Sequence, residues 1–168
     1  EFNPATYAQF KAWLLARDGG IYYVTGGRGR LAEMPGIAAP AFSGWLRAHE
    51  LLRGTDIRLA CPIAFPQGLN PPEIKQQEAE WALRNGAAEL DMVLNISELK
   101  SGHHDFVARD IAGVVKVAQR YGAPVKVILE CYLLTDEEKV AACQIAEREG
   151  AAWIKTSTQT QPGGATVE

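Results

Sequence analysis

This chain of 168 residues lacks the features that mark several classes of protein. Its three cysteines are an odd number without a Cys-x-x-Cys pair, which argues against a disulfide framework or a zinc site. No apolar run approaches the roughly 18 residues of a membrane-spanning helix, and no signal-peptide pattern opens the sequence. No basic run is present and the net charge is −3, so a nucleic-acid surface is not indicated. We therefore expect a cytoplasmic protein with no metal, no membrane partner and no nucleic-acid partner.

The remaining composition is that of an ordinary globular domain. Hydrophobic residues make up 47% of the chain and charged residues 22%, and its length fits one domain with its own core. The pattern is weak over residues 1–55. There we expect a helix opened by Asn3-Pro4, a β-prone run at 21–25 and a helix at 42–52. Residues 26–30 are glycine-rich but match no complete phosphate-loop pattern, so a surface turn is the better interpretation.

From residue 56 onward, short apolar runs alternate with segments of helical periodicity. The expected strands start near residues 57, 89, 125 and 153. The helices between them end at Gly86, Gly122 and Gly150, because helices commonly end at a glycine in the left-handed conformation. This alternation of strand and helix predicts a parallel α/β sheet, either doubly wound or closed as a (βα)8 barrel.

Polar residues within the expected strands favour the barrel. They fall at alternate positions of three consecutive strands: Asp91 and Asn95, Lys126 and Glu130, and Lys155 and Ser157. An open sheet covered on both sides would bury these groups against helices. A barrel instead collects them on its axis, where the strand ends build a site at the carboxyl-terminal mouth.

Lys155 is the most informative of these residues. It lies in an otherwise apolar run and is followed by three hydroxyl residues. Taken alone it fits an edge-strand or snorkelling lysine. With Lys126 nearby it suits Schiff-base chemistry, because a neighbouring cation lowers the pKa of an amine and makes it more nucleophilic. Asp91 is then placed to relay protons through a water molecule.

Seven stretches, which lie in order between residues 56 and 168, resemble deoxyribose-phosphate aldolase, a class I aldolase on a TIM barrel. They are FPQG (65–68), NGAAELDMVLN (85–95), LKSG (99–102), VKVILE (125–130), LLTDEEKV (133–140), WIKTST (153–158) and GGATVE (163–168). The resemblance implies a single aldolase domain over 1–168, with a divergent part at 1–55 and a family-like part at 56–168. About six βα units of the (βα)8 barrel are expected in this sequence, with the last two missing.

The resemblance also implies a function in carbohydrate catabolism. The family is a lyase that reversibly cleaves 2-deoxy-D-ribose 5-phosphate to D-glyceraldehyde 3-phosphate and acetaldehyde, without a cofactor. The implied substrate is a small phosphorylated sugar or aldehyde, and homo-oligomer formation is left open. The implied catalytic residues are Lys155 and Asp91. The implied supporting residues are Lys126 and Glu130, and the implied substrate-binding residues are Thr156, Ser157 and Asn95.

The sequence also departs from the family pattern. The family's second catalytic lysine, on its seventh strand, has no counterpart here, and Gln159 stands where the family has a phosphate-binding glycine. Two alternatives therefore stay open: a related Schiff-base aldolase with another acceptor, and a non-catalytic barrel paralogue or fragment. Cys131, which lacks an activating histidine, and the pair His103-His104 are interpreted as structural rather than catalytic or metal-binding.

Overall fold

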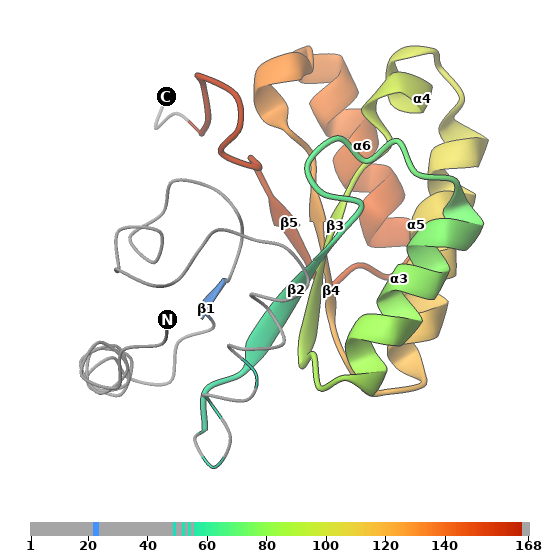
Figure 1. The fold of residues 1–168 in the computed structure, drawn as a ribbon. Helices are drawn as coiled ribbons and strands as arrows, with labels where there is room; N and C mark the ends of the chain where they lie inside the picture. The colour runs from blue at the N-terminus through green and yellow to red at the C-terminus, as the bar shows by residue number, and fades with distance from the viewer. Residues whose placement is uncertain (1–21, 24–48, 50–51, 53, 55, 166–168) are drawn as a thin grey trace.

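The computed structural model describes residues 22–23, 49, 52, 54 and 56–165 (Figure 1). The helix expected after Asn3-Pro4 and the turn at 26–30 lie outside these residues, and of the helix expected at 42–52 only His49 and Leu52 are described.

The described strands form one parallel sheet in strict chain order. The strands are β1 (Tyr22–Tyr23), β2 (Leu59–Ile63), β3 (Glu89–Val93), β4 (Val125–Ile128) and β5 (Trp153–Lys155). Each pairs in parallel with the next, so the strands expected near 57, 89, 125 and 153 are confirmed. Of the β-prone run at 21–25, only Tyr22 and Tyr23 are described, and they form β1.

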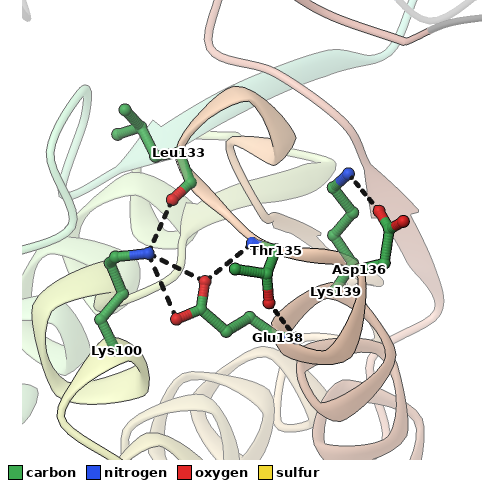
Figure 2. Close-up of polar contacts among 6 residues, drawn as sticks. All are labelled: Lys100, Leu133, Thr135, Asp136, Glu138 and Lys139. Atoms are coloured by element: carbon green, nitrogen blue, oxygen red, sulfur yellow. Dashed lines mark hydrogen bonds and ion pairs between the residues drawn. The ribbon is translucent and has the colours of Figure 1, made fainter.

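Helices connect the successive strands from β2 onward. They are α3 (Pro72–Arg84), α4 (Ile96–Lys100), α5 (His104–Gln119) and α6 (Asp136–Arg148), with the short 3-10 helix η1 (Cys131–Leu133) before α6. The five-residue α4 was not expected from the sequence, because it is too short to show a periodic pattern. The expected capping box of α6 is present: Thr135 Oγ1 accepts from the Glu138 amide at 3.3 Å, and Glu138 Oε2 accepts from the Thr135 amide at 2.8 Å (Figure 2).

This topology separates the two arrangements that the sequence left open. Because crossovers between parallel strands are right-handed, a sheet that always advances in the same direction receives its helices on one face. Figure 1 shows α3, α5 and α6 together on one side of the described sheet. A doubly wound sheet would reverse its strand order, and the described strands do not. The arrangement is that of successive units of a barrel.

The two faces of the sheet differ in chemistry. On β3, Leu90 and Met92 belong to the apolar core with residues of the helices, among them Val107 and Ile111 of α5. The residues that alternate with them, Glu89 and Asp91, point to the opposite face. Helix packing therefore fixes which side of each strand is left for charged groups.

A buried ion pair lies between the helices and β3. Lys75 of α3 contacts Asp110 of α5 with an Nζ–Oδ2 distance of 2.5 Å, and neither side chain is exposed. Lys75 Nζ also donates to the carbonyl of Val93, at the end of β3, at 3.1 Å. Burial lowers the pKa of Lys75 and raises that of Asp110, while the contact between them opposes both shifts. The pair thus joins two helices to the strand that carries Asp91.

We predict that Lys75→Met lowers the free energy of unfolding by about 3–5 kcal/mol, because it leaves Asp110 buried without its cation. The double variant Lys75→Met/Asp110→Leu should recover much of this loss, but not all of it, because the Val93 carbonyl still lacks a donor. Urea denaturation followed by circular dichroism measures both changes.

The matched control is Lys100→Met. Lys100 Nζ contacts Glu138 at 2.9 Å and donates to the Leu133 carbonyl at 2.9 Å (Figure 2). Its side chain is 45% exposed, so this change should cost about 1 kcal/mol or less. Equal losses for Lys75→Met and Lys100→Met would contradict a structural role for the buried pair.

Candidate active site

The candidate site is a cluster of charged residues on the sheet face opposite the helices. The sheet register builds it: Asp91 of β3 lies beside Lys126 of β4, and Lys155 of β5 lies beside Ile128 of β4. Lys155 is therefore one pleat nearer the carboxyl end of the sheet than Lys126. Side chains in neighbouring register positions of a parallel sheet point to the same face, so the three groups converge.

Asp91 lies between the two lysines. Its Oδ1 is 3.3 Å from Lys126 Nζ, and its Oδ2 is 3.4 Å from Lys155 Nζ. The Asp91 side chain is fully buried, whereas those of Lys126 and Lys155 keep 13% and 23% of their surface exposed. Of these three side chains, that of Lys155 is thus the most exposed.

Lys126 has further contacts that fix its position. Its Nζ also contacts Glu89 Oε1 and lies 5.5 Å from the centre of the Trp153 ring. Glu89 stands two residues before Asp91 on the same face of β3, and its side chain is buried. Glu89 has no role in the function expected from the sequence, although it shares the two-residue period of Asp91.

Burial changes the proton affinities of these groups. Loss of solvent raises the pKa of Asp91 from 3.8 to about 6; the charge of Lys155 opposes the shift and that of Glu89 adds to it. Burial, with repulsion from Lys155, lowers the pKa of Lys126 from 10.5 to about 8. A carboxyl group with a pKa near neutrality can both accept and return a proton, as a general acid–base catalyst must.

The predicted supporting residue Glu130 lies just beyond β4. Its side chain is buried, and its Oε2 accepts a hydrogen bond from the amide of Thr158 at 3.0 Å. Glu130 thus contacts the segment that follows Lys155. The sequence interpretation assigned no role to Thr158, which is also buried.

The three predicted substrate-binding residues take different positions. Thr156 is exposed and Ser157 is partly buried, with Ser157 Oγ donating to Thr156 Oγ1 at 3.2 Å. Asn95 is buried, and its Oδ1 accepts from the Glu98 amide at 3.2 Å as the N-cap of α4. Asn95 therefore has a structural role in the fold, and contact of any of the three with substrate stays a prediction.

A metal centre and a membrane span are both absent from the described residues. Among residues 22–23, 49, 52, 54 and 56–165, no three His, Cys, Asp or Glu side chains are grouped so as to hold a metal ion. Within the same part of the chain, no helix is long and apolar enough to cross a membrane. His103 lies at the surface with its Nδ1 2.6 Å from Glu98 Oε2.

Curated proteins of one enzyme family are similar to this chain in sequence. A curated deoxyribose-phosphate aldolase from Geobacillus sp. (strain WCH70) is 54% identical over 121 residues, which are 72% of this chain and 54% of the relative. The chain is a homologue of the deoxyribose-phosphate aldolases. No protein-family model matches it. The chain spans about half the length of the curated aldolases it matches.

Solved structures of aldolases share the fold. The structure described as QR15, an aldolase, superposes with a TM-score of 0.67 at 37% identity, over 72% of this chain and 55% of that one. The deoxyribose phosphate aldolase from Aeropyrum pernix, described as a unique tetramer, superposes with a TM-score of 0.63 at 37% identity, over 69% and 48% of the two chains. The parallel α/β sheet described above is thus that of the aldolase barrel.

The raised pKa of Asp91 predicts a pH-dependent stability that Asp91→Asn removes. The folded protein binds this proton more tightly than the unfolded chain does. The free energy of unfolding should therefore fall as the pH rises from about 4 to about 6, by on the order of 2 to 3 kcal/mol relative to the variant. Urea denaturation of both proteins at several pH values across this range measures the difference.

The control for this experiment is Asp136→Asn. Lys139 Nζ lies 2.8 Å from Asp136 Oδ1 and lowers the pKa of this exposed carboxyl group. The stability that Asp136 contributes is therefore lost as the pH falls, whereas that of Asp91 is lost as the pH rises. Parallel stability profiles of wild type and Asp91→Asn would show that Asp91 titrates as an ordinary carboxyl group.

Proposed function

We propose that the protein carrying this chain is a class I aldolase that cleaves and forms 2-deoxy-D-ribose 5-phosphate through a Schiff base on Lys155. The observation that supports this most is the contact of one buried carboxylate, Asp91, with two lysines, of which Lys155 is the more exposed. The similarity to deoxyribose-phosphate aldolases supports the proposed substrate, and the geometry supports the proposed roles.

In this proposal the Lys155 amine attacks the aldehyde carbon of the open-chain sugar. The carbinolamine then loses water to give an iminium ion. Its positive nitrogen accepts the electrons of the C2–C3 bond when a base removes the proton of the C3 hydroxyl. D-Glyceraldehyde 3-phosphate leaves, and protonation of the remaining enamine followed by hydrolysis releases acetaldehyde and regenerates Lys155.

Asp91 is the proposed proton relay. Its pKa of about 6 lets it hold a proton in one step and release it in the next near neutral pH. Lys126 keeps a cation at 3.3 Å from Asp91 throughout, including the steps in which Lys155 is covalently bound. Asp91→Asn should therefore slow turnover by on the order of 100-fold or more.

A second candidate is a Schiff-base aldolase that prefers an unphosphorylated acceptor. Gln159 is exposed and has a φ of +67°, a left-handed conformation that favours glycine, the residue of the resembled family at this place. A side chain thus occupies a position where that family brings bare backbone to a phosphate. The ratio of turnover for D-glyceraldehyde 3-phosphate and D-glyceraldehyde as acceptors distinguishes the two candidates.

The setting of the reaction is part of the proposal. We place the enzyme in the cytoplasm, in the breakdown of deoxyribose. The relative from Aeropyrum pernix is described as tetrameric, which supports a homo-oligomer for this protein as well.

The direct test is borohydride reduction of the full-length protein in the presence of acetaldehyde, followed by peptide mass spectrometry. Wild type should carry an ethyl group on Lys155, and Lys155→Arg should carry none, because a guanidinium does not form a Schiff base. Lys100→Arg, at a surface ion pair, is the matched control and should retain the adduct. An adduct on Lys126 in place of Lys155, or none in wild type, would refute the proposed role.

A further inference from the structure

Glu130 combines burial with an uncommon backbone conformation. It lies between β4 and η1, its side chain is buried, and its φ is +55°. A non-glycine residue with positive φ is uncommon and costs on the order of 1–3 kcal/mol, so it persists only where its surroundings hold it. Glycine would adopt this conformation more easily, and the chain has glutamate there instead.

The hydrogen-bond ladder explains this conformation. The Leu129 amide donates to the Lys155 carbonyl at 2.9 Å, and the Cys131 amide donates to the Thr156 carbonyl at 2.7 Å. From the first of these bonds to the second, the chain after β4 advances by two residues, whereas the chain after β5 advances by only one. Glu130 is the extra residue, as in a β-bulge, and such an insertion changes the direction of a side chain.

The side chain so directed meets Thr158. Glu130 Oε2 accepts hydrogen bonds from both the amide and the hydroxyl of Thr158, the former at 3.0 Å. A buried carboxylate requires such donors, since hydrogen bonds to a charged group are stronger than neutral ones. The other oxygen, Oε1, is buried and has no hydrogen-bond partner among the described residues, so Thr158 supplies the hydrogen bonds that this carboxylate has there. We call this contact the Glu130–Thr158 latch.

We propose that Glu130 is a positioning residue that holds Lys155 in place through this latch. The segment from Lys155 to Thr158 is fixed at one end by the ladder bonds to Leu129 and Cys131, and at the other by the latch. Without the latch this segment can move, and the 3.4 Å contact of Lys155 Nζ with Asp91 loses its backbone support. The inference rests on the proposed Schiff-base function. It gives the supporting residue Glu130 a specific role, and it adds Thr158 to the groups on which the reaction depends.

The test compares Thr158→Val with Thr158→Ser in the full-length protein. Valine keeps the shape but removes the hydroxyl that donates to Glu130, whereas serine retains it. The rate of borohydride trapping is measured against acetaldehyde concentration. Thr158→Val should lower the maximal rate about tenfold, because reacting groups displaced by even 1 Å lose up to about 100-fold in rate. The half-saturating concentration should change less than about twofold, and Thr158→Ser should restore the maximal rate.

Two further variants complete the design. Glu130→Gln keeps the size of the side chain and an oxygen that can accept from Thr158, but it removes the charge, so it should lower the maximal rate less than Thr158→Val does. Thr135→Val removes the N-cap hydroxyl of α6, away from the latch, and lowers stability by about 1 kcal/mol. It should leave the trapping rate unchanged, which separates the latch from a general loss of stability.

The outcomes are distinct. A wild-type protein without an adduct overturns the proposed function and this inference with it. If the wild-type protein forms the adduct and Thr158→Val is trapped as fast as wild type, the latch alone is overturned. The same follows if Thr158→Ser is trapped as slowly as Thr158→Val. If Glu130→Gln does not fold, the Thr158 pair still decides between these results.

Discussion

A carboxylate that is removed from water requires cations or hydrogen-bond donors, and the site described here depends on that requirement. Asp91 is fully buried on a strand that helices cover on its other face, and the register of β3, β4 and β5 brings Lys126 and Lys155 to its two oxygens. Burial and pairing act in opposite directions on Asp91. The result is a pKa of about 6, between that of a solvated carboxyl group and that of an isolated buried one.

The same requirement recurs at the strand ends around the site. Lys75 donates to the carbonyl at the end of β3, Glu78 accepts from the Ala64 amide after β2 at 2.8 Å, and Glu130 accepts from the Thr158 amide after β5. Each of these groups binds the backbone where a strand gives way to a loop. Contacts of 3.3 to 3.4 Å between side chains on different strands need such a fixed frame, because catalytic geometry tolerates displacements of only about 0.5 Å.

What the sequence predicts well depends on local periodicity. The strands after residue 56 and the convergence of Asp91, Lys126 and Lys155 follow from a two-residue period combined with parallel pairing, and the structure confirms both. The Lys75–Asp110 pair could not be found this way, because a lysine among polar helical residues looks exposed until the helix is placed on the sheet. Glu130 was expected to continue the face of Lys126. The extra residue in the ladder, which no sequence period reveals, instead directs it to Thr158.

The arrangement gives each of the two lysines a separate part in the proposed reaction. Within the cluster, two carboxylates, Glu89 and Asp91, contact two ammonium groups. Lys155 must lose its proton before it can attack a carbonyl. If Asp91, 3.4 Å away, accepts that proton, the total charge of the buried cluster does not change, and Lys126 continues to balance Glu89. A proton transfer between these two groups therefore forms the nucleophile without leaving an uncompensated charge in the sheet.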